Sequence, residues 1–194
     1  DSVSPSDLLK WLQSLPYQPI TRKNHRKTIR ALYNWAGDRG YCRTNPAKIV
    51  KDEKEVKDIE ILTVEEGRKL FEANMDSPGI GRLALEAFGM LRYSSAKRLR
   101  CEDINWEERG ITLPASQIKT ARRKYADGHP DNLWQWLEYA PKECWSMTER
   151  QYQEEKRFCF GRARVRHPHN CLRHSACTYH YAAFKDPGLT ASLM

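Results

Sequence analysis

The sequence predicts an α+β protein in which a small all-helical domain precedes a mostly helical domain with a small antiparallel sheet. Three observations predict this class. Apolar residues recur at helical spacing over most of the chain. Between residues 104 and 125 the spacing changes to short apolar runs around a turn, which is typical of strands. A mixed-charge stretch, residues 51–58, has almost no apolar content and indicates a linker.

We therefore divide the chain into a helical domain over residues 1–50, a linker over residues 51–62 and a second domain over residues 63–194. The chain does not begin with the basic and then apolar layout of a secretory signal. Its start is typical of the middle of a longer protein, so we expect the first domain to be incomplete at its N-terminus.

The composition favours a nucleic-acid partner. The 194 residues include 33 Lys and Arg against 25 Asp and Glu, which gives a net charge of +8 and a pI near 9.2. A basic excess favours polyanions, because neutralising phosphates releases counterions. No apolar run of about 18 residues occurs, so we expect no membrane span. The six cysteines lack paired short spacings, so we expect free thiols in a reducing cytosol.

The first domain is expected to hold two helices. Residues 4–7, Ser-Pro-Ser-Asp, form a helix start, and the apolar face that follows ends at Pro16. The second helix is expected over residues 21–39, before Gly40. Its apolar positions follow the i, i+3, i+4, i+7 pattern: Ile29, Leu32, Tyr33 and Ala36.

Five cations flank the apolar face of this second helix: Arg22, Lys23, Arg26, Lys27 and Arg30. At about 100° per residue they share one arc of the helix surface. We expect this basic stripe to contact DNA phosphates. The alternative is an ordinary solvated face.

The second domain is expected to open with a helix that Thr63 and Glu66 cap as a capping box. Further helices are expected over residues 81–90 and 94–100. Apolar residues on both sides of the turn at 108–110 predict two short strands, and residues 117–125 are expected to continue the sheet. Helices over residues 132–139, over 168–184 and from Leu189 onward complete the domain.

Three stretches of this domain carry residues that suggest chemistry. Residues 88–106 place Arg92 at the end of an apolar helix. Residues 118–123 form a basic tip of the sheet region that contains Lys119. Residues 168–175 place the sequence Leu-Arg-His-Ser, with Arg173, at a helix N-terminus.

In this order and spacing the three stretches resemble the phage-integrase, or tyrosine recombinase, family. The resemblance covers most of the chain: residues 21–46 are similar to the last part of the family's core-binding domain, and residue 63 onward resembles its catalytic domain. Each stretch alone is common, whereas the set is fairly specific. The resemblance implies site-specific recombination or integration of double-stranded DNA. It also implies a cytoplasmic, nucleoid-associated protein of a phage or prokaryotic mobile element.

In this family a tyrosine attacks a DNA phosphate and forms a 3′-phosphotyrosine, without a metal or nucleotide cofactor. The resemblance assigns Arg92 and Arg173 to the negative charge on the phosphate, which guanidinium groups can hold bidentately. It assigns Lys119 to protonation of the leaving oxygen. Arg122 and Arg123 beside it are expected to contact the DNA backbone. For the full-length protein it implies self-association as a tetramer on paired DNA.

The chain departs from the family pattern in two positions. Asn170 stands where the family usually has His; an amide can donate to a phosphate oxygen but cannot take a proton near neutral pH. Ser95 stands where the family tends to have an acidic residue. These departures motivate the alternative that the protein is a catalytically decayed relative, which binds DNA as a regulatory or architectural protein.

The family's Gly-His box and its tyrosine nucleophile have no match in the chain. Tyr179 and Tyr181 follow Arg173 too soon, and we interpret them as packing residues. We therefore expect this chain, as it stands, not to cleave DNA.

Three other features allow competing interpretations. Six possible metal ligands crowd into residues 167–180: His167, His169, Cys171, His174, Cys177 and His180. Cys171, His174 and Cys177 recur every three residues and so drift around a helix, and no second cluster of ligands completes a site, so we favour no metal. Three tryptophans are interpreted as packing residues rather than as a base-stacking surface: Trp134, Trp136 and Trp145. The alternating cations of residues 162–166 indicate either a strand or loop along the DNA or a solvated loop.

Overall fold

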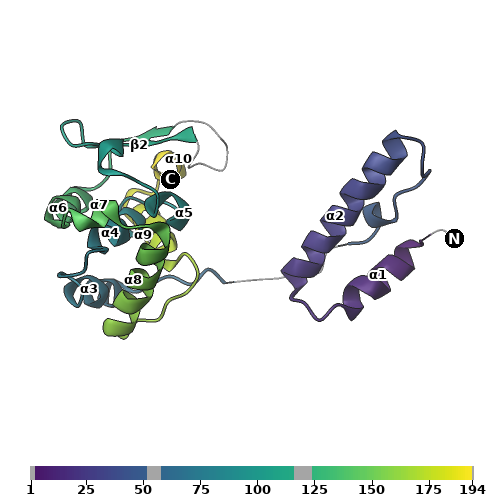
Figure 1. The fold of residues 1–194 in the computed structure, drawn as a ribbon, viewed down its shortest axis with the longest axis horizontal. Helices are drawn as coiled ribbons and strands as arrows, with labels where there is room; N and C mark the ends of the chain where they lie inside the picture. The colour runs from purple at the N-terminus through teal and green to yellow at the C-terminus, as the bar shows by residue number, and fades with distance from the viewer. Residues whose placement is uncertain (1–2, 52–57, 116–123, 194) are drawn as a thin grey trace. The chain divides into compact units, whose positions relative to one another are not determined.

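The computed structural model describes residues 3–51, 58–115 and 124–193. By its internal contacts the chain divides into unit 1, residues 1–58, and unit 2, residues 59–194 (Figure 1). Unit 1 is helical, and unit 2 is mostly helical with a three-stranded antiparallel sheet, so the predicted α+β class is confirmed. None of the described helices is both long and apolar enough to cross a membrane.

Unit 1 consists of helices α1 (Pro5–Ser14) and α2 (Pro19–Asp38) and the short 3-10 helix η1 (Pro46–Lys48). Helix α1 starts at the predicted signal. The Ser4 hydroxyl accepts from the Asp7 N–H, and the Asp7 carboxylate accepts from the Ser4 N–H. A small core forms where η1 meets both helices, from Leu8, Leu12, Ala47 and Val50.

Arg26 does not lie on an exposed basic stripe. Its side chain is only 8% exposed, and its Nη1 donates to the carbonyl oxygens of Ala47 and Val50 at 3.1 Å each. Ala47 lies in the short η1 helix and Val50 follows it, so their carbonyl oxygens need donors from outside this helix. Arg26 was predicted to contact DNA, whereas in the structure its guanidinium is used within unit 1. Lys27 and Arg30 are exposed.

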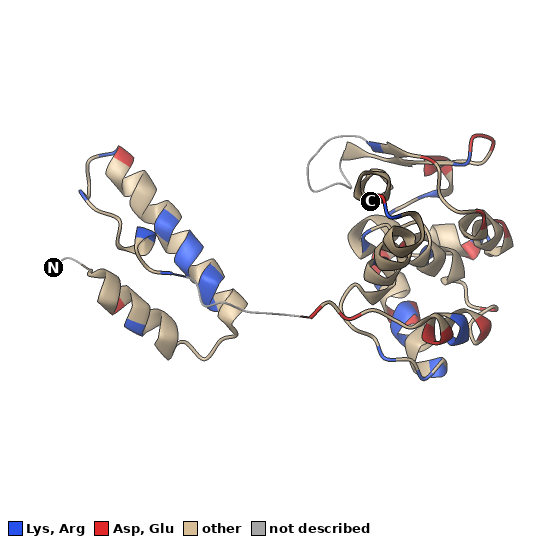
Figure 2. Cartoon of the chain, turned by 180° about the vertical axis from the view of Figure 1, so that it is seen from behind, with Lys and Arg blue, Asp and Glu red and all other residues tan. Residues whose placement is uncertain are grey.

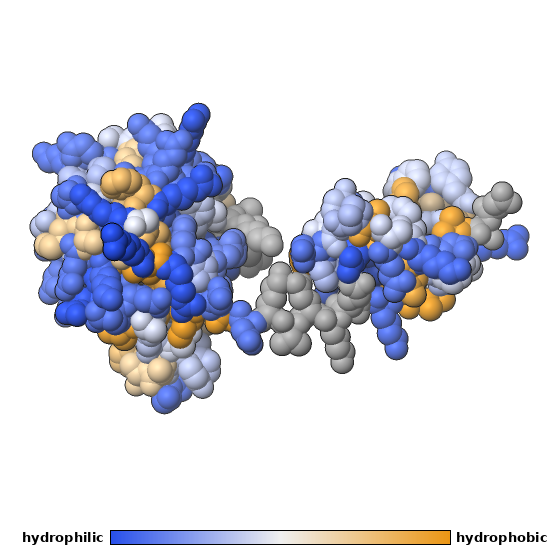
Figure 3. Space-filling view, turned by 90° about the horizontal axis from the view of Figure 1, so that it is seen from below, coloured by the Kyte–Doolittle hydropathy of each residue, from blue (hydrophilic) through white to orange (hydrophobic). Residues whose placement is uncertain are grey.

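The apolar face of α2 is only partly covered within unit 1. Ile29 packs against the small core of unit 1, but Leu32 and Trp35 are exposed. The Trp35 ring instead contacts the Tyr41 ring, with centroids 5.8 Å apart, and the Arg39 guanidinium, 4.6 Å from its centroid. Apolar residues accordingly reach the surface of this unit (Figure 3).

Unit 2 begins with α3 (Val64–Glu72), α4 (Ile80–Ala87), α5 (Tyr93–Ala96) and the 3-10 helix η2 (Cys101–Asp103). The sheet has the order β1 (Ile104–Asn105), β2 (Gly110–Leu113), β3 (Lys124–Ala126), with Ile111 opposite both Ile104 and Ala126. The remaining helices are α6 (Asp131–Tyr139), α7 (Glu143–Ser146), α8 (Glu149–Arg162), α9 (Cys171–Phe184) and α10 (Pro187–Ser192).

Helix α4 forms the centre of unit 2. Residues 80–86 are all buried, and α4 contacts α5, α6, α7 and α9. The buried Glu86 carboxylate accepts from the Tyr152 hydroxyl at 2.6 Å and from the Lys156 ammonium at 2.7 Å, which ties α8 to α4. Trp134 of α6 is fully buried in the same core and Trp136 packs against it, so the interpretation of these rings as packing residues is confirmed.

Helices α7 and α8 lie in residues 140–167, for which the sequence predicted no helix. The buried face of α8 consists of Tyr152, Lys156, Cys159 and Phe160, and the lysine interrupts the apolar pattern. Lys156 is buried there because its ammonium pairs with Glu86. The capping box of Thr148 and Gln151 is the sequence signal that marks the start of α8.

Three predicted helix boundaries are wrong. Helix α4 ends at Ala87 rather than near residue 90, and α5 ends at Ala96 rather than at residue 100. Helix α9 begins at Cys171 rather than at Pro168, because Asn170 has a left-handed backbone with φ 54. Asn170 thus precedes the helix instead of lying on it.

The basic stretch 162–166 is not a strand. Arg162 ends α8 and pairs with the Asp76 carboxylate. Arg166 pairs with Glu66 at 2.9 Å and donates to the Ile61 carbonyl at 2.5 Å. Both side chains therefore hold parts of unit 2 together.

His129 is a buried titratable group between β3 and α6. Its side chain is 6% exposed, and neither ring nitrogen has a hydrogen-bond partner among the described residues. Burial lowers the pKa of His129 to about 4, and the Lys124 ammonium acts in the same direction. The neutral ring is therefore the form that the fold holds at neutral pH.

We expect Arg26→Met to destabilise unit 1 by about 1–3 kcal/mol, because the carbonyls of Ala47 and Val50 lose their donor. Arg30→Met, on the exposed side of the same helix, is expected to change stability by less than about 0.5 kcal/mol. Amide hydrogen exchange along α2 measures the difference, since it reports local opening. Equal protection of α2 in the two variants would contradict the structural role of Arg26.

We expect His129 to make unit 2 sensitive to acid. Its folded-state pKa of about 4 lies below the ordinary value of 6.5, so its stabilising contribution is present above pH 6.5 and is lost as the pH falls towards 4. His129→Leu removes this titration. The difference in unfolding free energy between the original protein and this variant should shrink by up to about 3 kcal/mol over that window. A difference that stays constant from pH 7 to 4 would show that His129 titrates normally.

Candidate functional site

Arg173 is the central residue of the candidate site. It lies in the first turn of α9 and is 7% exposed. Its Nε and Nη2 are buried and have no hydrogen-bond partner among the residues that the structure describes. Burial lowers the pKa of the Arg173 guanidinium, and the nearby Arg92 guanidinium lowers it further. A buried cation with unused donors is costly, so this group is poised to bind an anion.

Arg92 approaches Arg173 from the start of α5. It is exposed and occupies the N-cap position of that helix. A tight turn after α4 brings it there: Met90 has φ 55, and a Cβ on Gly89 would lie 2.7 Å from the Leu85 carbonyl oxygen, so glycine is required.

The residue after Arg92 is held firmly. The Tyr93 ring stacks on the Tyr152 ring with centroids 5.8 Å apart, and the Lys156 ammonium lies 5.0 Å from its centroid. The buried pair of Lys156 and Glu86 thereby helps to fix the backbone at Arg92.

Lys124 adds a third cation that the sequence analysis missed. It is the first residue of β3, opposite Leu113, and is half-buried. Burial lowers the pKa of its ammonium, and the guanidinium groups of Arg173 and Arg92 lower it further. Three cations from α9, α5 and β3 therefore lie near one another. The signal in the sequence was the basic run at residues 122–124, of which only the first two were singled out.

Three of the predicted site residues lie outside the described residues: Lys119, Arg122 and Arg123. Arg92 and Arg173, drawn from separate stretches of the chain, interact electrostatically, and their shared role at a phosphate stays a prediction. The place of Lys119 relative to them stays a prediction.

Asn170 occupies the N-cap position of α9, three residues before Arg173. Its amide Nδ2 lies 2.9 Å from the Nε2 of His169, and its side chain makes no capping hydrogen bond. The amide is half-buried, so it keeps the ability to meet a ligand at this helix end.

The face of α9 around Arg173 also carries Cys177, one turn further along. Its thiol contacts the Arg173 guanidinium, and burial raises the pKa of this thiol. A protonated thiol leaves the positive charge of Arg173 uncompensated, which favours an anionic ligand.

The crowded His and Cys residues of 167–180 make separate contacts within unit 2. Among the described residues no group of three or more His, Cys, Asp or Glu side chains could hold a metal ion. The His167 ring stacks on Phe160 at 4.0 Å, Cys171 is buried, and His180 Nδ1 lies 2.9 Å from the Thr190 hydroxyl. The packing interpretation holds for these side chains.

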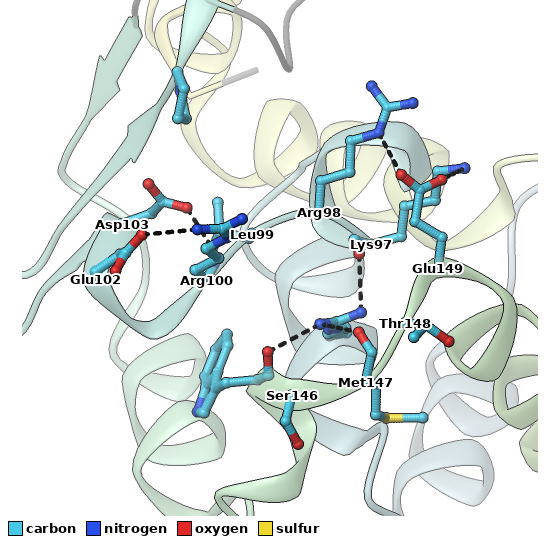
Figure 4. A pocket seen from close by; sticks show the side chains of 13 residues that line it. Lys97, Arg98, Leu99, Arg100, Glu102, Asp103, Ser146, Met147, Thr148 and Glu149 are labelled. Atoms are coloured by element: carbon cyan, nitrogen blue, oxygen red, sulfur yellow. Dashed lines mark hydrogen bonds and ion pairs between the residues drawn. The ribbon is translucent and has the colours of Figure 1, made fainter.

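A separate cleft of about 730 Å³ lies between α5, η2 and the loop from α7 to α8 (Figure 4). Beneath it, Arg82 donates to the carbonyl oxygens of Lys97 and Met147 at 2.9 Å each. On its rim, Lys97 and Arg98 both pair with Glu149. The cleft is therefore lined by ion pairs and differs from the cation cluster at Arg173.

Comparisons with known proteins agree on the fold. No protein-family model and no curated protein matches the sequence. A phage λ integrase dimer bound to a COC′ core site matches with a TM-score of 0.75 and 14% identity, over 100% of this chain and 79% of that chain. A λ integrase tetramer bound to a Holliday junction matches with a TM-score of 0.71 and 17% identity, over 100% and 64%.

The integrase of the transposon Tn1549, in complex with circular intermediate DNA, matches with a TM-score of 0.69 and 18% identity, over 100% of this chain and 78% of that chain. At such identities structural similarity establishes the fold. The chain therefore has the fold of the phage and transposon integrases, as the resemblance in its sequence implied.

Proposed function

We propose that the chain is the DNA-binding and catalytic part of a tyrosine recombinase, and that Arg92 and Arg173 hold the phosphodiester at which DNA strands are exchanged. The observation that carries the proposal is the buried Arg173 guanidinium, which has two unused donors and two further cations nearby. A phosphate satisfies those donors and balances the charge at once.

The chemistry of such a site is electrostatic. During attack on a phosphodiester, negative charge builds on the non-bridging oxygens, and fixed guanidinium donors stabilise it without reorganisation. Lys124 strengthens the positive field on the side of β3. Its pKa is lowered by burial and by both arginines, so its ammonium gives up a proton more readily than an exposed lysine does. Lys119 remains the lysine that the family resemblance assigns as general acid.

Asn170 fits a supporting role in this proposal. At the N-cap of α9 its amide can donate to a phosphate oxygen, but it cannot act as a base. Proton transfer therefore rests on the lysines. No tyrosine nucleophile is assigned within the chain; the Tyr179 hydroxyl donates to the Leu62 carbonyl at 3.0 Å.

Unit 1 supplies a second DNA contact in this proposal. Lys27 and Arg30 are exposed on α2, and Arg22 and Lys23 are half-buried beside them. Figure 2 shows basic residues repeated along this helix. A row of cations at helical spacing can follow a phosphate backbone without reading its sequence.

The λ integrase that this fold matches forms a tetramer on a Holliday junction. We propose that the full-length protein assembles on paired DNA in the same way, in the cytoplasm of a prokaryotic or phage-infected cell. The alternative function, a relative that binds DNA without cutting it, is favoured by Asn170 and Ser95, both of which replace groups usual in the family.

We expect Arg173→Gln to reduce covalent capture of duplex DNA by about a hundredfold or more, because it removes a preorganised cation from the transition state. The assay uses the protein extended through a C-terminal tyrosine segment and a nicked duplex that contains its recombination site. Duplex affinity should change by less than about threefold, since other cations dominate binding. Arg157→Gln, an exposed arginine of α8, is the matched control.

Covalent capture that survives Arg173→Gln would refute the site. No capture by the unaltered protein, together with normal duplex binding, would favour the non-cutting alternative.

We expect Lys27→Glu combined with Arg30→Glu to weaken binding to any duplex sequence. The slope of log K against log salt should fall by up to about 0.9 for each lost phosphate contact. Arg68→Glu combined with Arg150→Glu, at two exposed arginines of unit 2, serves as the charge-matched control. If both proteins show the same salt slope, the row on α2 is an ordinary solvated surface.

A further inference from the structure

The helix that carries Arg173 is fastened on another face by the segment that leads into unit 2. The Leu62 N–H donates to the Ser175 hydroxyl oxygen at 2.7 Å, and the Tyr179 hydroxyl donates to the Leu62 carbonyl at 3.0 Å. Both polar groups of one backbone residue are thus bound by α9. We call this set, Leu62 with Ser175 and Tyr179, the α9 clamp.

The clamp and the cation face different sides of α9. At 100° per residue, Ser175 and Tyr179 lie about 40° apart and share one face of α9. Arg173 and Cys177 have the same spacing and share another face. Ser175 is about 160° from Arg173 around the helix axis. The clamp therefore contacts α9 on the side opposite to the candidate anion site.

The clamp is built into the structure rather than laid on its surface. Leu62 and Ser175 are both buried, and the Ser175 hydroxyl also donates to the Cys171 carbonyl at 2.8 Å. Next to it, Arg166 donates to the Ile61 carbonyl and pairs with Glu66, a member of the capping box of α3. The segment at residues 61–62 is thereby fixed from both sides.

Helix α9 needs such a fastening at its N-terminal end. The helices α1, α3 and α8 each begin with a capping box, whereas Asn170 gives α9 no side-chain cap. Arg173 lies in this uncapped first turn. A guanidinium at the end of a long side chain moves by more than about 1 Å when its helix rotates by 10–20°, and such sites work only within about 0.5 Å.

We propose that Ser175 and Tyr179 are positioning residues, which fix the rotation of α9 and thereby hold the Arg173 guanidinium in its anion-binding position. This inference rests on the proposed function of Arg173 as a phosphate-binding residue. It makes the backbone of Leu62, far away in sequence, part of the scaffold of the site.

The test uses the full 194-residue chain, with the NMR signal of the Arg173 Nε–H as its readout and inorganic phosphate as the probe. Ser175→Ala and Tyr179→Phe each remove one hydrogen bond of the clamp. Both are expected to shift the Arg173 signal of the unbound protein and to weaken its phosphate affinity by about fivefold. Ser175→Thr keeps the hydroxyl and is expected to restore both values. Tyr181→Phe, an exposed tyrosine of the same helix, is the matched control.

The two proposals can fail separately. If Ser175→Ala and Tyr179→Phe lower the unfolding temperature but leave the Arg173 signal and the phosphate affinity unchanged, the clamp is merely structural and the inference is overturned. If phosphate leaves the Arg173 signal of the unaltered protein unchanged, the proposed function of Arg173 is overturned. The Arg173 signals of the unbound variants then still decide whether the clamp positions this side chain.

Discussion

The proposed function depends on one buried guanidinium in unit 2, that of Arg173. Among the described residues three arginines are buried, and two of them donate to backbone carbonyls: Arg26 to Ala47 and Val50, and Arg82 to Lys97 and Met147. Arg173 is as deeply buried, yet two of its nitrogens meet no acceptor among the described residues. Because a buried unpaired donor costs free energy, and Arg82 leaves only its Nε unpaired, Arg173 has the larger unmet need for an acceptor among the described residues. A site that awaits an anionic ligand accounts for this difference.

The rest of unit 2 can be understood as the support of that residue. Helix α4 anchors α8 through the buried group of Glu86, Tyr152 and Lys156. The Lys156 ammonium lies over the ring of Tyr93, next to Arg92. The same side chains therefore stabilise the core and position the cation cluster. Met90 and Asn170, two of the five described non-glycine residues with positive φ, lie shortly before Arg92 and Arg173 in the sequence.

Much of the fold followed from local sequence chemistry. The capping boxes at Ser4 and Thr63 placed two helix starts correctly, because they depend only on neighbouring residues. Helix α8 was missed because Lys156 occupies its buried face, and its partner Glu86 is 70 residues away in the sequence. Helical spacing placed Arg26 on the basic stripe, because spacing shows which residues share one side of a helix. It does not show that the carbonyls of Ala47 and Val50, distant in the sequence, bind one of those residues. The pairing of β2 with β3 places Lys124 at the site, and the sequence alone does not specify the register of this pairing.

A crystal structure of the chain bound to a short duplex tests the central claim most directly. We expect one phosphodiester within about 3 Å of Nε and Nη2 of Arg173, with the Arg92 guanidinium and the Lys124 ammonium around the same phosphate. A complex in which Arg173 keeps its unpaired nitrogens, while the DNA contacts other parts of unit 2, would contradict it.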